Sequence, residues 1–300
     1  MKRWGALVAV LCAAPALAAP GDWVNAVLPV DDPPRMAAID LPVSLPRANP
    51  AREGWAQQAP DQRLVYNVAT PQILPWPSSL PTGVVAPAVL LVPGGGYQFL
   101  AMDNEGFDVA RRLDRLGVRV FIVKYRTLPL PDGFAAFKAA IAATFQRGVR
   151  PTADNRPYAV ADTQAAIRMV RARAGAWRVD PARVGILGFS AGAITVLATT
   201  QANAADARPD FVGMIYGPTA GTGVPPHAPP LFSAIAADDR FFRDQDLSLL
   251  HAWRTAGGSV EFHLYSAGGH GFASQPNGTT SDAWFDQYAL WLKDTGLLKR

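Results

Sequence analysis

Short, almost purely apolar runs recur along the chain from about residue 64 onward. They lie at residues 84–92, 118–125, 183–189, 211–216, 230–237 and 260–265. The first five are nearly continuous in apolar residues, which is typical of strands buried on both faces of a parallel sheet. Segments with helical spacing of apolar residues lie between and around them, at residues 106–116, 159–174, 191–201, 246–256 and 282–295. This alternation predicts an α/β fold with a mostly parallel, doubly wound sheet and helices on both faces.

Two segments depart from the alternation. Residues 20–60 are rich in proline, which disfavours long helices and predicts an extended N-terminal arm lying on or near the domain. Residues 127–156 form a long passage that we expect to carry a short helix at about 134–145 and to cover one rim of the sheet as a cap. No repeat or linker follows Pro60, so residues 61–300 are predicted to form a single catalytic domain.

The first 19 residues have the pattern of a secretory signal peptide. Lys2 and Arg3 precede an apolar run that is too short to span a bilayer, and small residues follow, ending in Ala16-Leu17-Ala18. The alternative is a buried N-terminal helix. The signal predicts an exported protein, periplasmic or secreted, with no membrane attachment after signal removal. Cys12, the only cysteine, lies in the signal, so we expect a mature chain without disulfides.

The charge of the chain is close to balanced. The formal net charge is +4, and removal of Lys2 and Arg3 leaves 26 basic against 24 acidic residues, or +2. No run of Lys or Arg forms a basic patch, so the sequence predicts no nucleic-acid partner.

Ser190 is the first candidate for chemistry. It lies in Gly188-Phe189-Ser190-Ala191-Gly192, a G-x-S-x-G pattern between a predicted strand and a predicted helix. A nucleophile elbow requires this strand–turn–helix context, and a Cβ at either glycine would collide where the sharp turn brings the backbone close. The N–H of Ala191 would open the helix and point at a developing oxyanion. The alternative is an ordinary structural turn.

A serine hydroxyl needs a base to remove its proton, and the sequence has four histidines. His227 lies in PPHAPP, where a surface loop is expected. His251 falls within a predicted helix, and His263 lies inside a predicted strand, where a structural role is expected. His270 follows the last strand in the glycine-rich SAGGHGF, at the sheet end where α/β sites lie. We therefore predict that His270 is the base.

The base needs a carboxylate to hold its tautomer, and an oxyanion needs a second N–H donor. Asp238 and Asp239 directly follow the run at 230–237, so serine, acid and histidine occur in the order found in α/β-hydrolases. Successive side chains at a strand end point in opposite directions, which leaves the choice between the two open. Gly94-Gly95-Gly96 follow the run at 84–92, at the position of an HGGG-type oxyanion loop.

A phosphate-binding loop is the alternative interpretation of the three glycines. Neither G-x-x-x-x-G-K-[ST] nor a complete G-x-G-x-x-G is present, however, and a dinucleotide site would leave the serine, acid and histidine unexplained. The sequence implies no metal and no cofactor.

Several segments between residues 64 and 298 carry a family likeness. They are PGGGY (93–97), the EG of DNEGFDVARRL (105–106), VKYR (123–126), the run from Asp162 through IRMVRARAGAWRVDPARVGILGFSAG, RPDF (208–211), AADD (236–239), GGHGF (268–272) and the Trp-rich C-terminal helix. With these segments the chain resembles the α/β-hydrolase fold esterases that include acetyl xylan and feruloyl-type carbohydrate esterases.

The resemblance implies specific roles for the candidate residues. It implies a triad of Ser190, Asp239 and His270, and an oxyanion hole formed by Gly95, Gly96 and Ala191. Asp239 is favoured over Asp238 because the acid of such proteins stands three residues before an apolar residue, here Phe242. The chain departs from its relatives at Gly192-Ala193-Ile194, where many have GGH, and in the length of residues 127–156, which bears on substrate size.

The sequence therefore predicts a secreted serine esterase that acts through an acyl-enzyme, and the resemblance suggests O-acetylated sugars or xylan-type polysaccharide as substrate. A general carboxylesterase, lipase or peptidase of the same fold is an alternative, because fold and triad do not fix the leaving group. A non-enzymatic scaffold is less favoured, since no triad member is missing. Tyr97 and Trp284 are candidates for stacking on a sugar ring, with core packing as the alternative for Trp284. The sequence does not indicate which oligomeric state the protein adopts.

Overall fold

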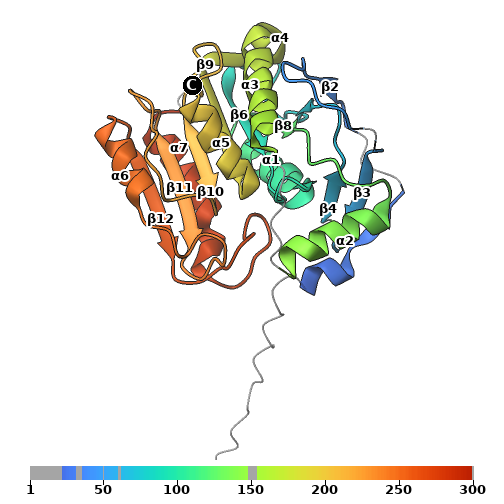
Figure 1. The fold of residues 1–300 in the computed structure, drawn as a ribbon. Coiled ribbons are helices and arrows are strands. Elements are labelled where there is room, and N and C mark those ends of the chain that lie inside the picture. The colour runs from blue at the N-terminus through green and yellow to red at the C-terminus, as the bar shows by residue number, and fades with distance from the viewer. Residues whose placement is uncertain (1–21, 32–35, 50, 60–61, 148–153, 299–300) are drawn as a thin grey trace, which may run out of the picture.

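A sheet of eight strands runs through the molecule in the order β12-β11-β10-β9-β6-β8-β5-β2 (Figure 1). This computed structural model describes residues 22–31, 36–49, 51–59, 62–147 and 154–298, so the predicted signal at 1–19 lies outside them. Neighbouring strands from β12 to β8 are parallel, and β5 and β2 add antiparallel pairs. The strands are β2 (Ile39–Asp40), β5 (Gln72–Pro75), β6 (Ala86–Val92), β8 (Arg119–Lys124), β9 (Val179–Phe189), β10 (Val212–Ile215), β11 (Leu231–Ala236) and β12 (Val260–Tyr265).

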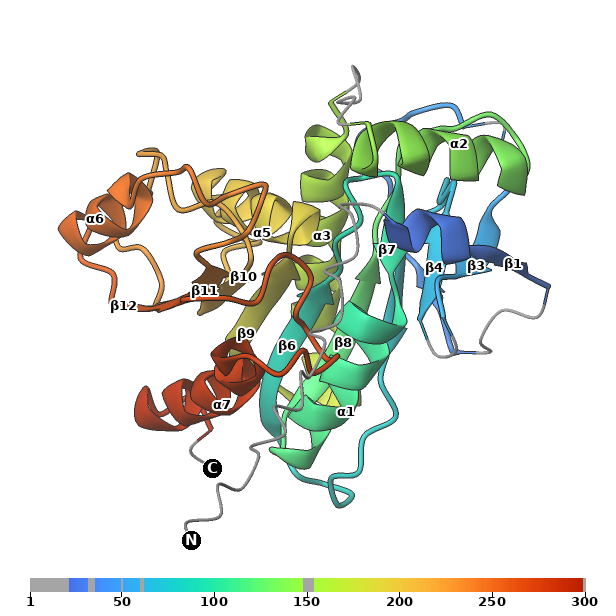
Figure 2. The same ribbon diagram turned by 90° about the horizontal axis from the view of Figure 1, so that it is seen from below.

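Helices cover both faces of this sheet. Figure 2 shows α3, α5 and α6 on one face and α1 and α7 on the other. The helices of this layer are α1 (Asp108–Arg115), α3 (Arg156–Ala172), α4 (Ala174–Trp177), α5 (Ala191–Gln201), α6 (Ser248–Thr255) and α7 (Trp284–Asp294), with a π-helical turn η2 (Asp103–Phe107) and a 3-10 turn η3 (Thr280–Ala283). The predicted α/β class is confirmed. Within the described ranges, no helix is both long and apolar enough to cross a membrane.

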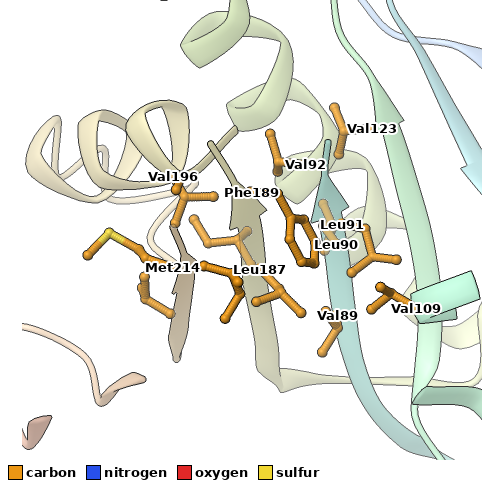
Figure 3. Close-up of a cluster of buried hydrophobic side chains, with 14 of the residues drawn as sticks. Val89, Leu90, Leu91, Val92, Val109, Val123, Leu187, Phe189, Val196 and Met214 are labelled. Carbon is orange, nitrogen blue, oxygen red and sulfur yellow. The ribbon is translucent and has the colours of Figure 1, made fainter. Parts of the chain in front are cut away.

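The middle of the sheet forms the core. All seven residues of β6 are buried, as are the last six of β9. Figure 3 shows side chains of the two strands, among them Leu91 and Leu187, packed with Val109 and Val196 from helices on opposite faces. Because helices cover both faces, neither face of these strands can carry polar residues, which explains the continuous apolar runs in the sequence.

A second, smaller sheet lies beside the first, with the antiparallel order β1-β3-β4-β7. Its strands are β1 (Leu28–Val30), β3 (Gly54–Gln57), β4 (Arg63–Tyr66) and β7 (Phe99–Ala101). Helix α2 (Phe134–Phe145) and the 3-10 helix η1 (Asp22–Ala26) pack on it, and Figures 1 and 2 show both beside β4. The Tyr66 and Phe137 rings stack at 4.1 Å between their centroids. The helix expected at about 134–145 is therefore present, and it covers this sheet.

The N-terminal segment is more closely integrated than an extended arm. The expected boundary near residue 60 runs between β3 and β4, which pair as antiparallel neighbours. Strand β2 from the same segment joins the main sheet beside β5. The sequence did not reveal these strands because they are two to four residues long and give no sustained alternation.

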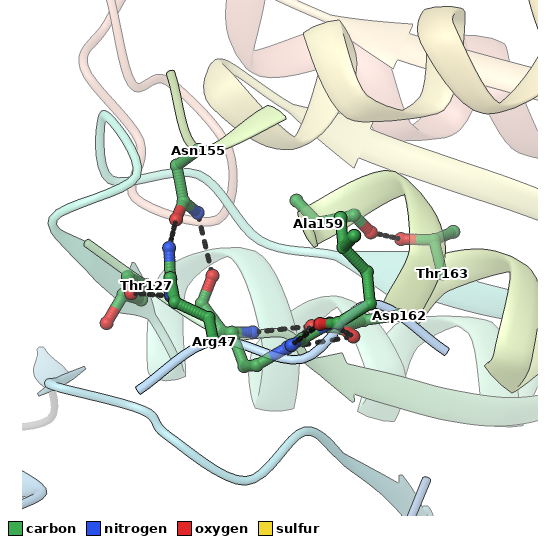
Figure 4. Close-up of polar contacts among 8 residues, drawn as sticks. Arg47, Thr127, Asn155, Ala159, Asp162 and Thr163 are labelled. Atoms are coloured by element: carbon green, nitrogen blue, oxygen red, sulfur yellow. Dashed lines mark hydrogen bonds and ion pairs between the residues drawn. The ribbon is translucent and has the colours of Figure 1, made fainter. Parts of the chain in front are cut away.

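A buried polar network fixes the N-terminal segment to the domain (Figure 4). Arg126, two residues after the end of β8, pairs with Asp162 on α3 at 2.6 Å, and both side chains are 1% exposed. The Arg126 guanidinium also donates to the Leu45 carbonyl at 2.5 Å. Arg47 donates to the Thr127 carbonyl at 2.5 Å and to the Asn155 side chain. Residues 45–47 are thereby attached to both ends of the 127–156 segment.

Candidate active site

Ser190 occupies the sharp turn between β9 and α5. Its backbone has φ 51° and ψ −117°, a conformation that is costly for a residue with a side chain and persists only when the surroundings impose it. The turn is packed closely: a Cβ on Gly192 would come within 1.9 Å of the Val92 carbonyl oxygen, and a Cβ on Gly188 within 2.4 Å of the Gly192 carbonyl oxygen. The strand–turn–helix geometry that the pattern predicts is present, and it lifts the serine hydroxyl above the sheet.

Ser190, His270 and Asp239 lie in one hydrogen-bonded chain. The His270 Nε2 is 2.8 Å from the Ser190 Oγ, and its Nδ1 is 2.8 Å from the Asp239 Oδ2. Asp239 is fully buried, and its other oxygen accepts the Phe241 N–H at 2.9 Å. With a proton on Nδ1 donated to Asp239, the Nε2 is free to accept the serine proton. The structure thus brings the three predicted side chains together in the order that proton transfer requires.

The neighbouring candidates take other positions. Asp238 is exposed, and its carboxylate accepts the Gly269 N–H at 2.8 Å, which braces the loop that carries His270. His263 contacts Glu261 on the same strand at 2.9 Å, and His251 is exposed on α6. His227 lies in a loop. Of the four histidines, His270 is the one whose side chain lies within hydrogen-bonding distance of the Ser190 hydroxyl.

The glycine loop after β6 lies against the nucleophile. A Cβ on Gly94 would come within 2.8 Å of the Ser190 Cβ, and a Cβ on Gly95 within 2.2 Å of the Phe99 carbonyl oxygen. Gly95 and Gly96 have φ values of 127° and 60°, which a glycine adopts at little cost. Within the described ranges, the N–H groups of Gly95, Gly96 and Ala191 have no hydrogen-bond acceptor. The predicted oxyanion donors are therefore unoccupied by internal hydrogen bonds and near the serine.

The two predicted sugar-stacking residues lie outside the cavity wall. Trp284 is fully buried, its Nε1 donates to the Ala273 carbonyl at 2.5 Å, and its ring packs on Phe189, so the stacking role is wrong. Tyr97 directs its hydroxyl to the Thr195 Oγ1 at 3.1 Å, and burial raises the pKa of Tyr97 to about 12. Tyr97 is partly buried, and it is not among the described residues that line the cavity over Ser190.

A cavity of about 870 Å³ opens over Ser190 and His270. Four aromatic side chains line one part of it: Trp23, Phe99, Phe145 and Phe241. Neighbouring rings are 5.3 Å apart for Trp23 and Phe145 and 6.3 Å apart for Phe145 and Phe241, and Phe241 lies 4.7 Å from the His270 ring. We call these four residues the aromatic wall. The sequence did not reveal them because they come from four separate segments and none of them is part of a motif.

Polar residues complete the cavity lining. Arg63 is held in a bidentate pair with Asp103, at 2.7 and 2.8 Å, and Arg240 lies over the Phe241 ring at 4.6 Å. Across the described ranges, no group of three or more His, Cys, Asp or Glu side chains is placed to hold a metal ion. Hydroxyl and carbonyl groups of a polar substrate would find guanidinium donors here, beside an aromatic surface.

A serine on a strained turn, a histidine and a buried aspartate at the C-terminal ends of parallel strands define the α/β-hydrolase class. Comparison with protein families agrees: the dienelactone hydrolase family matches residues 130–295, more than half of the chain, and the chain belongs to this family. The matched range contains Ser190, Asp239 and His270, whereas the Gly95 loop precedes it. The predicted membership in an α/β-hydrolase family is thus confirmed.

Individual relatives extend the comparison. An acetylxylan esterase of Xylanibacter ruminicola is 26% identical over 251 residues, which cover 72% of this chain and 46% of that protein. The chain therefore spans about half the length of this relative. Among solved structures, an acetyl ester-xyloside bifunctional hydrolase from Caldicellulosiruptor lactoaceticus superposes with a TM-score of 0.61 at 22% identity, covering 77% of this chain and 90% of that one. A carboxylesterase from Lactobacillus plantarum gives 0.60 at 20% identity, covering 78% and 96%. These two structures share the fold.

Proposed function

We propose that the protein is a serine esterase that hydrolyses carboxylic esters through an acyl-enzyme. The observation that carries the proposal is the hydrogen-bonded chain from Ser190 through His270 to buried Asp239. As the Ser190 Oγ attacks the ester carbonyl, its proton moves to His270, which then protonates the leaving alkoxide. His270 next removes a proton from water, which attacks the acyl-enzyme and releases the acid and free Ser190.

The oxyanion of each tetrahedral intermediate is assigned to the backbone N–H groups beside Ser190. Ala191 lies at the N-terminus of α5, where the N–H groups have no acceptor within the helix and the helix dipole favours negative charge. Gly95 and Gly96 supply the second donor from the loop after β6. Fixed donors of this kind stabilise developing charge without having to reorganise during the reaction.

The substrate we propose is an O-acetylated sugar or a xylan-type polysaccharide. The acetylxylan esterase relative supports this choice, and so does the aromatic wall, because aromatic rings beside polar donors suit the apolar faces and hydroxyls of a sugar. A second candidate is a general carboxylesterase. The same wall favours it, since Phe99, Phe145 and Phe241 also suit an apolar acyl chain.

Acetate release tests the proposal. The wild type is expected to release acetate from acetylated xylan and from nitrophenyl acetate, and Ser190→Ala is expected to lose roughly 10^4-fold or more in kcat on both. Hydrolysis of the small ester alone, with a preference for longer acyl chains, would favour the general carboxylesterase. Undiminished turnover by a folded Ser190→Ala variant would overturn the serine mechanism.

We also propose that the protein is exported, on the strength of the signal pattern at residues 1–19. N-terminal sequencing of the protein recovered from a cell that expresses the whole chain tests this. Cleavage after the Ala16-Leu17-Ala18 segment supports export, and an intact Met1 in the mature protein would contradict it.

A further inference from the structure

A buried carboxylate that the mechanism above does not use lies at the wall of the active-site cavity. Glu105, on η2, is 5% exposed, and both of its oxygens accept hydrogen bonds. One bond comes from the Gly94 N–H at 2.5 Å, and the other comes from the Tyr216 O–H at 2.7 Å. A buried carboxylate is costly unless it is paired or hydrogen-bonded, so its retention at this point needs a physical reason.

The two partners of Glu105 belong to the two halves of the catalytic machinery. Gly94 precedes the predicted oxyanion donors. It lies so close to Ser190 that an added Cβ would be 2.8 Å from the Ser190 Cβ. Tyr216 follows β10, with a strained φ of 39°, and its ring packs against the His270 ring in an edge-to-face pair at 4.9 Å between centroids. A single side chain thus connects the oxyanion loop to the tyrosine that packs against the histidine.

We propose that Glu105 is a positioning residue for the reaction: it holds the Gly94 loop and Tyr216 in place, and its negative charge stabilises the imidazolium that His270 becomes when it takes the Ser190 proton. The inference rests on the proposed function for its catalytic consequence. Its electrostatic part is a property of His270 that can be measured without substrate.

The charged surroundings permit this role. Burial raises the pKa of Glu105, while the hydrogen bonds from Tyr216 and Gly94 and the charge on His270 favour its ionised form. Tyr125 faces the same carboxylate, and burial raises its pKa well above the usual value, so it stays neutral. Asp103, on the same turn, is neutralised by Arg63.

Other titratable groups lie near His270 in the described part of the chain. Asp239 binds its Nδ1 directly, and Asp238 braces the loop before it through the Gly269 N–H. Arg240 lies over the Phe241 ring at 4.6 Å, and the same ring contacts the imidazole; the Asp239 carboxylate also interacts with the Arg240 charge. Tyr216 is neutral because burial raises its pKa well above the usual value. Glu105 is therefore a second source of negative potential for the imidazolium, on a different element from Asp239.

Glu105→Gln isolates the charge. The glutamine oxygen can still accept the Gly94 N–H, and its amide can donate to the Tyr216 hydroxyl, so both contacts remain while the charge is lost. We expect the His270 pKa, measured by NMR titration and assigned with a His270→Gln sample, to fall by about one unit. The acid limb of kcat/KM on nitrophenyl acetate should move to lower pH by the same amount. Because one pKa unit is a tenfold change in equilibrium, kcat should fall roughly tenfold at unchanged KM.

Two variants serve as controls. Asp114→Asn removes a buried carboxylate on α1 that accepts the Ser79 N–H at 2.9 Å, remote from the site, and should leave the His270 pKa unmoved. Tyr216→Phe keeps the ring against His270 but removes one donor to Glu105. Loss of this hydrogen bond raises the Glu105 pKa, so part of the Glu105 population is protonated and the His270 pKa should fall by a smaller amount. If Glu105→Gln fails to fold, the His270 pKa measured in Tyr216→Phe tests the proposal instead.

The outcomes separate the two proposals. An unchanged His270 pKa in folded Glu105→Gln overturns the inference, even if kcat falls, because a loss without a titration shift indicates an ordinary packing role. A shifted pKa in a protein whose wild type hydrolyses no ester would uphold the charge role and overturn the proposed function instead.

Discussion

Two adjacent aspartates at the end of β11 show how strongly position decides the role of a residue. Asp239 is fully buried with one oxygen on His270, whereas its exposed neighbour Asp238 reaches only a backbone N–H of the following loop. Strand β11 ends at Ala236, and the chain then turns, with the Asp239 N–H donating to the Ala236 carbonyl at 3.0 Å. The alternation of side-chain directions along a strand therefore does not reach the two aspartates. The preference for Asp239 came from the family resemblance.

The difference predicts unequal effects of matched substitutions. Asp239→Asn should lower kcat on nitrophenyl acetate by roughly 10^4-fold, because an amide at this position favours the wrong histidine tautomer. Asp238→Asn should lower it less than about tenfold, since an amide oxygen can still accept the Gly269 N–H. Steady-state kinetics on both variants measure this. A larger loss in Asp238→Asn than in Asp239→Asn would contradict the assigned acid.

Other residue-scale roles were harder to predict. Ser190 and His270 are recognisable because glycines and strand ends mark them in the sequence. Trp284 has no such marker, and its burial beneath Phe189 follows from the helix α7 packing on the sheet. Glu105 lies in a polar segment, DNEGF, which resembles a solvent-facing helix start, so only the folded chain reveals that it lies at the wall of the active-site cavity.

At the scale of elements, the Arg126–Asp162 pair joins the end of β8 to α3. Both side chains are buried, and the Arg126 backbone N–H also donates to Asp162 at 2.9 Å. Removal of one partner leaves a buried charge without compensation, which is more costly than removal of both.

Arg126→Met is therefore expected to lower the free energy of unfolding by about 3–5 kcal/mol. The double variant Arg126→Met/Asp162→Leu should recover much of that loss, because it leaves no unpaired charge in the interior. Urea denaturation followed by circular dichroism measures both. If the double variant were less stable than the single variant, the pair would contribute net stability instead.

Element boundaries show where sequence patterns succeed. The helix expected at 191–201 and the one expected at about 134–145 have the observed bounds of α5 and α2. Both are runs of apolar residues between glycine or turn signals. The small sheet was not predicted, because β4 pairs with β7 across more than 30 residues and neither strand exceeds four residues. Pairing between short, distant segments depends on the surfaces that meet, and periodicity does not encode those.

At the scale of the whole molecule, the two sheets divide the site between them. The main sheet supplies Ser190, Asp239 and His270 from strand ends that a buried core holds rigidly. The small sheet and its helices supply Trp23, Phe99 and Phe145 of the aromatic wall. Catalytic groups need fixed geometry, and substrate selection depends on cavity shape, so the division places each task on a suitable part. The sequence motifs mark the catalytic part, and the selective part was visible only in the structure.

Trapping the covalent intermediate tests most directly whether Ser190 is the nucleophile. The protein is mixed with nitrophenyl acetate, quenched in acid within the burst phase and examined by intact-mass and peptide mass spectrometry, with Ser190→Ala alongside. The serine mechanism predicts one acetyl group on the wild type, located on Ser190, and none on the variant. Acetylation at another residue, or an equal adduct on Ser190→Ala, would rule out Ser190 as the nucleophile.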